Sequence, residues 1–279
     1  MKIKTALVLG SSGQIGRELV KLLRNEGIHA LELDIKVGAE QDLRTFNNAY
    51  LDECMRAADF IFFLAFDVGG SKYLHDKQFE FDFISNNSRI MENTFESIRR
   101  YKKPFIFAST QMSSMTDSAY GVLKLIGEFY TNSLNGLVIK LWNVYGIEEQ
   151  DEKSHVITDF IKKAHKEKVI QMITDGQEER QFLHASDCSK CLLSLMRSYD
   201  VIPRSEKLHI TSFKWTKILD IANYIAEFFP GTKVLPGLKK DLVQNGVRNE
   251  PSEFILNFWK PAIIVQKGIE MVIQELKLR

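Results

Sequence analysis

Three glycines spaced three residues apart, directly after a short apolar run, constrain this chain more than any other feature. The run Thr5–Leu9 is long enough for a buried strand, and Gln14–Asn25 has the period of an amphipathic helix. Between them, Gly10 allows a sharp turn, Gly13 lets the backbone approach a pyrophosphate, and Gly16 lets the helix pack closely on the sheet. Because the N-terminus of a helix attracts anions, the segment predicts a dinucleotide-binding strand-turn-helix unit.

An acidic residue follows the second predicted strand. Asp34 comes directly after the apolar stretch Ala30–Leu33, where its carboxylate can accept hydrogen bonds from the hydroxyls of an adenine ribose. The same negative charge would repel a 2'-phosphate, so the pattern favours NAD over NADP, whereas Lys36 nearby favours the opposite. The alternative is that Asp34 is an ordinary turn aspartate.

Farther along the chain, Tyr120 and Lys124 are separated by about one helical turn. A phenol and an ammonium with this spacing share one face of a helix, so the cation is expected to favour the phenolate and to lower the pKa of Tyr120 toward neutrality. An amphipathic surface pair has the same spacing, but the glycine turn upstream favours a tyrosine that transfers protons. The two motifs together predict a redox enzyme.

Composition excludes several other classes of protein. The 279 residues carry a formal net charge of +1, which gives no global field to attract a polyanion, so no nucleic acid is expected as a partner. The basic run from Lys162 to Lys168 includes Glu167 and is interpreted as a solvated helix face. The longest apolar run, Phe60–Phe66, is far shorter than the roughly 20 residues that cross a bilayer, so no membrane segment is expected.

The cysteines Cys54, Cys188 and Cys191 do not suggest a disulfide framework and fit a reduced cytoplasm. Cys188 and Cys191 have the C-x-x-C spacing of redox and metal sites, but no second pair or clustered histidines accompany them. The leucines that follow indicate a helix packed on a core. No metal is expected.

Short apolar strands alternate with helical patterns through the first half of the chain. This order predicts an α/β fold: a Rossmann-type doubly wound parallel sheet with both faces covered. Beyond Gly146 the strict alternation of strands and helices ends, which predicts a smaller α/β lobe. We therefore expect an NAD-binding domain over residues 1–146, with part of residues 180–213 returning to it, and a mainly substrate-binding lobe over 147–279. The other expected elements are strands at Phe60–Leu64, Phe105–Ala108 and Leu137–Leu141, and helices at Leu51–Arg56, Ile84–Tyr101, Val156–Lys166, Ile218–Phe229 and Ile264–Leu276.

The order of these motifs resembles the extended short-chain dehydrogenase/reductase family, and within it the NAD-dependent nucleotide-sugar epimerases and dehydratases. The resemblance covers nearly the whole chain. Besides the glycine turn and the Tyr-Lys pair, it includes Ser109-Thr110 at a strand end, the turn Asn143–Gly146, and the block Asp175–Asp187. It implies NAD as the cofactor and a nucleotide-diphosphate sugar as the substrate.

The resemblance also implies roles for individual residues. In the implied mechanism, Tyr120 takes a proton from a sugar hydroxyl while hydride passes to the cofactor, Lys124 supports the phenolate, and Thr110 hydrogen-bonds the reacting oxygen. The implied cofactor contacts are Gly10, Ser12, Gly13, Gln14, Ile15, Gly16, Asp34, Leu64, Ala65, Asn87, Ser109, Tyr120 and Lys124. The implied substrate contacts are Thr110, Gln111, Asn143, Arg180 and Arg248.

Some of these assignments have alternatives. Arg180 suits bidentate binding of a diphosphate, but an ion pair between the lobes would use the same residue. His184 matches a family position, and the alternative is that it caps a helix or packs in the core. The remaining histidines have no partner pattern and are interpreted as structural or exposed: His29, His75, His155, His165 and His209.

Departures from the family pattern narrow the expected chemistry. Family dehydratases place an Asp-Glu pair directly after the threonine, where this chain has Gln111 and Met112, and neither side chain can act as an acid or base. Met112 also replaces the cysteine of relatives that epimerise next to a carbonyl. Only nine residues separate Thr110 from Tyr120, fewer than in most extended members, which predicts a more open sugar pocket.

What remains is oxidation and reduction, and we expect an NAD-dependent nucleotide-sugar epimerase acting at C4 through a transient keto-sugar. The alternative is an NAD(P)-dependent nucleotide-sugar 4-ketoreductase or dehydrogenase that turns over its cofactor. A scaffold without activity is disfavoured by the intact Ser109, Thr110, Tyr120 and Lys124 set. The family commonly forms homodimers through the helix that carries Tyr120 and the helix before it. Candidate interface residues here are Met91, Phe95, Ile98, Leu125, Phe129 and Tyr130. The alternative is that the same apolar stripe serves the core.

Overall fold

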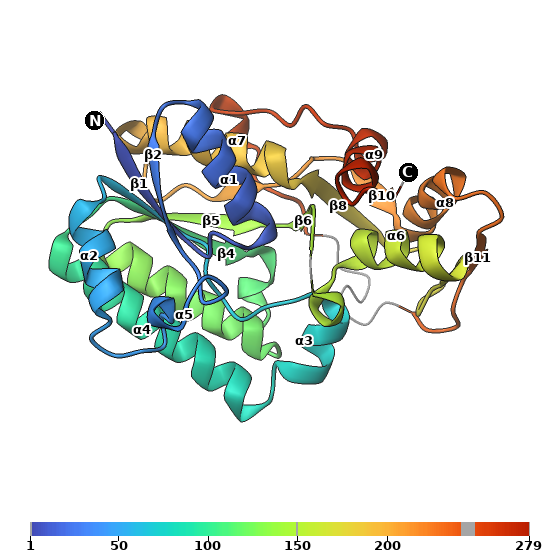
Figure 1. The fold of residues 1–279 in the computed structure, drawn as a ribbon, viewed down its shortest axis with the longest axis horizontal. Coiled ribbons are helices and arrows are strands. Elements are labelled where there is room, and N and C mark those ends of the chain that lie inside the picture. The colour runs from blue at the N-terminus through green and yellow to red at the C-terminus, as the bar shows by residue number, and fades with distance from the viewer. Residues whose placement is uncertain (1, 149, 241–248, 279) are drawn as a thin grey trace.

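A six-stranded parallel sheet organises the molecule (Figure 1). The computed structural model describes residues 2–148, 150–240 and 249–278. The chain leaves the first strand toward one edge of the sheet and then returns to its other side, which creates a switch point where open α/β sheets bind ligands. In spatial order the strands are β2 (His29–Leu33), β1 (Thr5–Leu9), β3 (Phe60–Phe63), β4 (Phe105–Thr110), β5 (Leu137–Leu141) and β9 (Leu208–Ile210).

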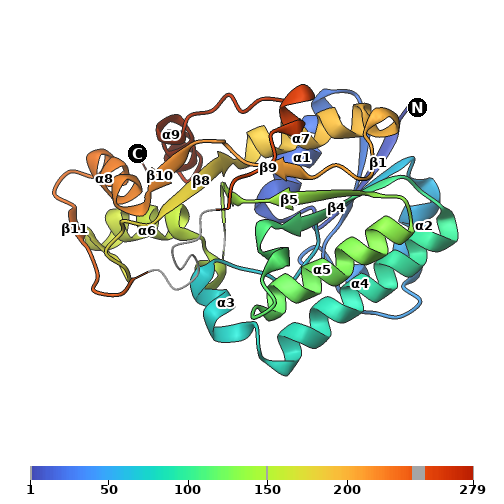
Figure 2. The same cartoon turned by 180° about the vertical axis from the view of Figure 1, so that it is seen from behind.

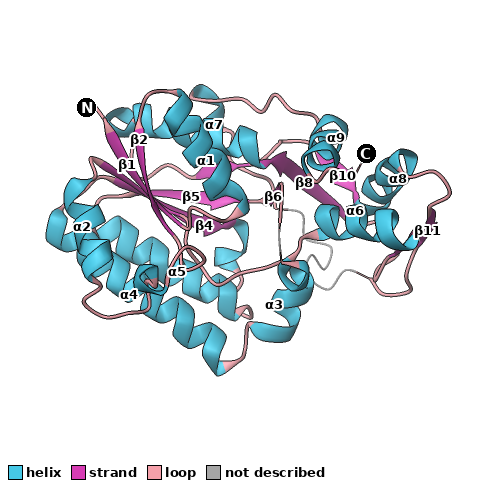
Figure 3. Ribbon diagram, in the orientation of Figure 1, coloured by secondary structure: helices cyan, strands magenta, loops and turns pink. Residues whose placement is uncertain are grey.

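Helices cover both faces of this sheet, as Figures 1 and 3 show. Because side chains alternate along a strand, Ala6 and Val8 of β1 enter one apolar core, whereas Leu7 and Leu9 enter the other. Against the first core lie α1 (Gln14–Asn25) and α7 (Ala185–Arg197), which pack on each other. Against the second lie α2 (Ala49–Ala57), α4 (Phe81–Tyr101) and α5 (Ala119–Ser133), of which α4 and α5 face the viewer in Figure 2.

The second half of the chain builds a smaller lobe beside the sheet. Its core contains Tyr145, Phe160 and Ile221, and it is separate from the two cores of the main sheet. The strands form a three-stranded and a two-stranded sheet: β6 (Asn143–Tyr145), β8 (Glu179–His184) and β10 (Trp215–Lys217), and β7 (Val169–Gln171) with β11 (Lys233–Leu235). The helices are α6 (Val156–Glu167), α8 (Ile218–Phe228) and α9 (Val265–Glu275).

Short 3-10 turns and one short helix link these elements. Helix α3 (Ser71–Lys77) and the turn η3 (Asp151–Lys153) contact each other near the boundary between the sheet and the lobe. The other turns are η1 (Ala39–Gln41), η2 (Gln111–Ser114), η4 (Tyr199–Val201) and η5 (Phe254–Asn257). Strand β9 returns from the second half of the chain to pair with β5. The division of the chain at residue 146 stays a prediction.

The predicted fold class is confirmed, and β1, β5 and α1 have the predicted bounds. Strand β4 is longer than predicted, because Ser109 and Thr110 continue the pairing with β5. Helix α3 was not predicted; it has seven residues and no buried side chain. Cys188 and Cys191 are buried in α7 as the leucine pattern indicated, and burial raises the pKa of both thiols.

Candidate active site

A pocket of about 510 Å³ opens at the carboxyl ends of the central strands. One wall is made by the glycine turn after β1, by the residues that follow β2 and β3, by the last residues of β4, and by Tyr120 and Lys124 of α5. The opposite wall comes from the segment between β6 and α6. The pocket therefore lies at the switch point of the sheet, between the sheet and the second lobe.

The glycine turn has the geometry of a phosphate cradle. Gly10 has a φ of +85°, and a Cβ there would lie 2.9 Å from the backbone of Ala65. A Cβ at Gly16 would collide with the carbonyl oxygen of Gly10. Helix α1 begins at Gln14 without a side-chain cap, so its first-turn amides are available to an anion. The turn lines the pocket and fits the pyrophosphate of a dinucleotide.

Asp34 both lines the pocket and stabilises its own turn. Its carboxylate accepts hydrogen bonds from the backbone amides of Ser12, at 3.0 Å, and of Lys36, at 2.9 Å. The second contact, two residues along the chain, is that of an Asx turn. Both interpretations of Asp34 are thus compatible with this structure, since a carboxylate oxygen has more than one lone pair.

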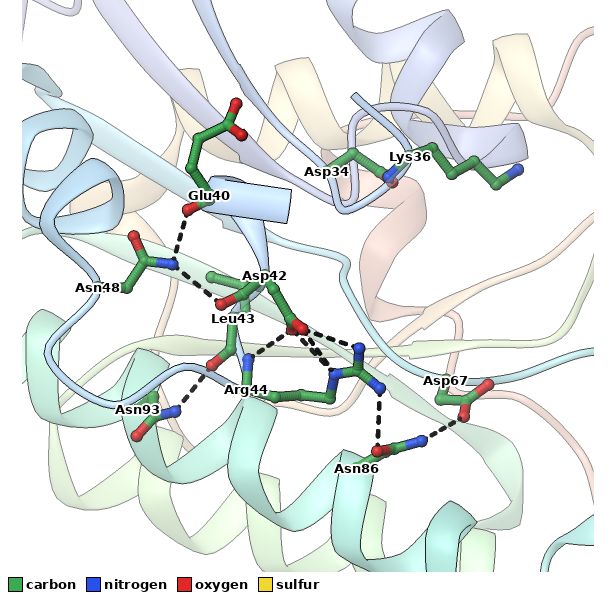
Figure 4. Close-up of polar contacts among 10 residues, drawn as sticks. All are labelled: Asp34, Lys36, Glu40, Asp42, Leu43, Arg44, Asn48, Asp67, Asn86 and Asn93. Atoms are coloured by element: carbon green, nitrogen blue, oxygen red, sulfur yellow. Dashed lines mark hydrogen bonds and ion pairs between the residues drawn. The ribbon is translucent and has the colours of Figure 1, made fainter. Parts of the chain in front are cut away.

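A polar cluster that the sequence analysis missed forms another part of the pocket wall (Figure 4). Arg44 Nε and Nη2 donate to Asp42 Oδ1 and Oδ2 at 2.9 and 2.8 Å. Arg44 Nη1 donates to Asn86 Oδ1 at 3.1 Å, and Asn86 Nδ2 donates to Asp67 Oδ2 at 3.2 Å. The hydrogen bonds from Arg44 lower the pKa of Asp42. The sequence does place the opposite charges of Asp42 and Arg44 two residues apart, which could have predicted this pair.

The three predicted catalytic residues meet in this pocket. Tyr120 and Lys124 are buried on α5, and Thr110 ends β4. The start of α5 is fixed by Ser118, whose hydroxyl accepts from the Gly121 amide at 3.1 Å and donates to Gln78 at 2.8 Å. Capping of this kind sets where the first turn of a helix begins, and therefore where Tyr120 lies.

The pKa values of the pair differ from the sequence prediction. Burial raises the pKa of Tyr120 to about 12, and a side-chain hydrogen bond with Thr110 acts in the opposite direction. Burial lowers the pKa of Lys124 to about 7. The expected lowering of the Tyr120 pKa by Lys124 is therefore wrong for this structure. The physical reason is that Lys124 Nζ donates to the Ala108 carbonyl at 2.6 Å and lies 3.8 Å from the centre of the Phe66 ring, not against the phenol.

Most of the predicted cofactor contacts line the pocket, and one does not. Asn87 is fully buried and holds the backbone of Asp67 through two hydrogen bonds, of 2.7 and 3.0 Å. It therefore shapes the loop after β3, while its neighbour Asn86 reaches the pocket. The predicted cofactor residues in the lining are Gly10, Ser12, Gly13, Gln14, Ile15, Gly16, Asp34, Leu64, Ala65, Ser109, Tyr120 and Lys124.

The predicted substrate contacts are distributed differently. Thr110 lines the pocket, whereas Gln111, Asn143 and Arg180 lie outside its lining. Arg180 is on β8, where its Nη1 donates to the Glu179 carbonyl at 2.9 Å. Arg248 lies outside the described residues. His184 caps α7, since its Nδ1 accepts from the Ser186 amide at 3.2 Å.

The wall opposite the sheet contains two polar side-chain pairs that were not predicted from the sequence. Lys153 Nζ donates to Asp67 Oδ1 at 2.7 Å, and His155 Nδ1 lies 2.5 Å from Glu148 Oε1. Burial acts to raise the pKa of Glu148, but the hydrogen bonds from His155 outweigh it and the pKa is lowered. The interpretation of His155 as merely structural or exposed overlooked this pairing, because only the folded loop brings residues 148 and 155 together.

Comparisons with known proteins agree with this geometry. Residues 6–211 match the NAD dependent epimerase/dehydratase family. The chain is 24% identical over 261 residues to the uncharacterised UDP-glucose epimerase YtcB of Bacillus subtilis, covering 79% of this chain and 81% of that protein. Among the described residues, no helix is long and apolar enough to cross a membrane.

Two solved structures share the fold. One is the epimerase Mth375 of Methanothermobacter thermautotrophicus, with a TM-score of 0.85, 18% identity, and coverage of 98% of this chain and 92% of that one. The other is the GDP-6-OMe-4-keto-L-xylo-heptose reductase of C. jejuni, with a TM-score of 0.83, 17% identity and coverage of 99% of each chain. The protein is an enzyme that belongs to the NAD-dependent epimerase/dehydratase family, of the extended short-chain dehydrogenase/reductase type.

Proposed function

We propose that the protein is an NAD-dependent nucleotide-sugar epimerase that acts at C4 through a transient keto-sugar. One observation carries the proposal: Thr110, Tyr120 and Lys124 line the same pocket as the glycine turn and Asp34. A sugar bound beside these side chains would be within reach of a cofactor held by the turn.

The chemistry assigned to the chain is proton transfer at one sugar oxygen. NAD, when bound, supplies a hydride acceptor and a positively charged ring. Tyr120 takes the proton of the sugar hydroxyl, and Thr110 donates a hydrogen bond to the same oxygen. Because burial holds the pKa of Tyr120 near 12, the phenolate needs a positive charge nearby, and Lys124 provides one only while it is an ammonium.

We assign NAD rather than NADP because Asp34 presents a carboxylate at the end of β2. Lys36 and Arg17 line the pocket as well, and these cations favour the second candidate function, an NAD(P)-dependent 4-ketoreductase or dehydrogenase that exchanges its cofactor. A structural neighbour is named as a reductase, so the fold is compatible with either reaction.

The substrate is proposed to be a nucleotide-diphosphate sugar, such as the UDP-glucose named for the Bacillus relative. Lys153 and His155, on the wall opposite Tyr120, offer hydrogen-bond donors to its phosphates or sugar hydroxyls. We keep as proposed substrate contacts three residues outside the pocket lining: Gln111, Asn143 and Arg180. They would contact the substrate only if the second lobe moved closer to the sheet.

A homodimer is proposed through the outer face of α4 and α5 (Figure 2). Met91, Phe95 and Ile98, which were candidates for this interface, are instead buried against the sheet and belong to the core. Large apolar side chains exposed on the two helices are Phe81, Ile84, Val122, Ile126, Phe129 and Tyr130. Phe129→Glu should convert a dimer to monomers in light scattering, and a monomeric parent would contradict the proposal. A cytoplasmic location, where the free cysteines would stay reduced, is proposed with it.

The reaction is tested by incubating the purified protein with UDP-, GDP-, dTDP- and CDP-sugars without added cofactor and following sugar stereochemistry by NMR. Inversion at C4 supports the epimerase. Product that forms only with added NAD(H) or NADP(H), in proportion to the cofactor consumed, supports the reductase or dehydrogenase instead.

A further inference from the structure

Three consecutive residues at the end of β4 are each held by one residue of α5. The α5 residues are four apart, so they share the helix face that packs on the strand. The contacts pair Ala108 with Lys124, Ser109 with Glu128, and Thr110 with Tyr120. Two of the three helix residues are the proposed catalytic pair, and Glu128 is the third member of the same row.

Glu128 is a buried carboxylate with defined partners. It is 8% exposed, and its Oε1 accepts a hydrogen bond of 2.5 Å from the Ser109 hydroxyl. Its Oε2 lies 3.3 Å from the ammonium of Lys140, which also donates to Ser113 at 2.8 Å. Lys140 is on β5, so the carboxylate is held between the helix and two neighbouring strands.

The surroundings of Lys124 are otherwise apolar. Its ammonium lies 3.8 Å from the centre of the Phe66 ring and 5.1 Å from that of Phe107, and the Ala108 carbonyl is its hydrogen-bond partner. Burial lowers the pKa of Lys124, and the charge of Glu128 acts to raise it. Without a nearby anion, an ammonium in such a site would lose its proton more readily.

Two other titratable groups near this row, Tyr120 and His209, are uncharged at neutral pH. Tyr120, on the same face, stays neutral at ordinary pH because burial raises its pKa. His209 on β9 lies beside Lys140, and burial lowers its pKa to about 4, so it carries no charge at neutral pH. Its Nδ1 accepts a hydrogen bond from Trp142 Nε1 at 3.2 Å. Lys140 is therefore the charged group that competes with Lys124 for Glu128.

We propose that Glu128 is a positioning residue for the catalytic pair: its carboxylate fixes Ser109 and supplies the negative charge that keeps Lys124 an ammonium, while Lys140 sets how much of that charge reaches Lys124. This inference rests on the proposed function, because it takes Lys124 to be charged when Tyr120 transfers a proton.

Two variants test the inference with opposite expected signs. Glu128→Gln keeps a hydrogen-bond acceptor for Ser109 but removes the charge, so the pKa of Lys124 falls and activity is lost at a pH lower by about one unit. Lys140→Met removes the competing cation, so the pKa of Lys124 rises and activity persists to higher pH. A role limited to packing would lower activity at every pH without moving the alkaline limb of the profile.

A second measurement does not depend on turnover. The protein is labelled with ¹³C at the lysine ε-carbon, and Lys124 is titrated by NMR in the cofactor-free chain, its signal assigned from its loss in Lys124→Met. The expected result is a downward shift of the midpoint in Glu128→Gln and an upward shift in Lys140→Met.

Unchanged midpoints, or shifts of the same sign in both variants, would overturn the inference. If Glu128→Gln fails to fold, Lys140→Met decides alone, since a midpoint that does not rise contradicts the proposal. Opposite shifts in a protein that converts no nucleotide sugar would reject the proposed function while the electrostatic link between Glu128 and Lys124 stands.

Discussion

The two walls of the pocket are built in different ways. The sheet wall takes its residues from the ends of parallel strands and from α5, elements that pack on the two cores of the main sheet. The wall of the second lobe is a loop between β6 and α6, and two side-chain contacts hold it: the ion pair of Lys153 with Asp67, and the contact of His155 with Glu148. The Lys153–Asp67 pair also joins the two walls.

This difference separates the two tasks of the site. In the buried wall, burial raises the pKa of Tyr120 and lowers that of Lys124, so both neutral forms are favoured. The loop wall is more exposed, since 34% of the Lys153 side chain and 36% of the His155 side chain are accessible to solvent. Changes in the first wall should therefore affect the chemical step, and changes in the second should affect substrate binding.

The largest effect is expected from Tyr120→Phe. Removing the hydroxyl should lower kcat by roughly 10²- to 10⁴-fold, the range for general acid-base groups, with NAD affinity nearly unchanged. Stopped assays analysed by NMR give kcat, and calorimetry gives NAD affinity. Tyr145→Phe is the matched control, because that buried hydroxyl donates to the Val265 carbonyl outside the pocket lining. Full activity of Tyr120→Phe would show that the Tyr120 hydroxyl does not transfer the proton.

A smaller effect is expected from Asp34→Asn. Losing charge-assisted hydrogen bonds to a ribose should cost about 1.5–3 kcal/mol of NAD affinity, roughly 10- to 100-fold, and NADP should gain relative to NAD. Titration calorimetry with both cofactors measures this. Asp59→Asn is the control, because Asp59 also accepts two backbone amides beside a strand, yet lies outside the pocket lining. An unchanged ratio of affinities would contradict the NAD assignment.

Lys124→Met should show how much the buried ammonium lowers the free energy of unfolding. The folded pKa of about 7 lies below the ordinary value of 10.5, so the charged form destabilises the fold fully below pH 7, and this cost fades as the pH rises from 7 toward 10.5. The variant should therefore be more stable than the parent by about 1 kcal/mol or more at pH 6, and this difference should narrow as the pH rises above 7. Thermal unfolding across this range tests the sign, and a gap that widens with pH would contradict it.

The smallest effect is expected from Lys153→Met in the loop wall. A partly exposed ion pair contributes about 0.2–1 kcal/mol, so KM for the sugar nucleotide should rise only two- to fivefold while kcat stays close to that of the parent. Lys163→Met, which breaks an ion pair with Asp159 on α6 outside the pocket lining, is the control. A fall in kcat larger than the rise in KM would contradict the assignment of substrate binding to the loop wall and of the chemical step to the sheet wall.

Much of the sheet wall was predictable because its groups lie at fixed places relative to the strands. A glycine turn after a strand, an aspartate after the next, and a helix that carries Tyr120 and Lys124 are local patterns, and parallel strands bring their ends together at one edge. The loop wall has no such pattern. His155 and Glu148 meet through a loop, and Arg44 reaches Asn86 on a distant helix, so neither pairing could be derived from periodicity.

The sequence by itself determined the order of strands and helices, the position of the glycine turn and the residues that could transfer a proton, because these depend on local spacing and hydrophobic period. Only the tertiary structure decided which charges Tyr120 and Lys124 experience. Their pKa values depend on burial and on groups such as the Ala108 carbonyl and the Phe66 ring, which reach Lys124 only once α5 packs against β4 and the loop after β3 closes over it.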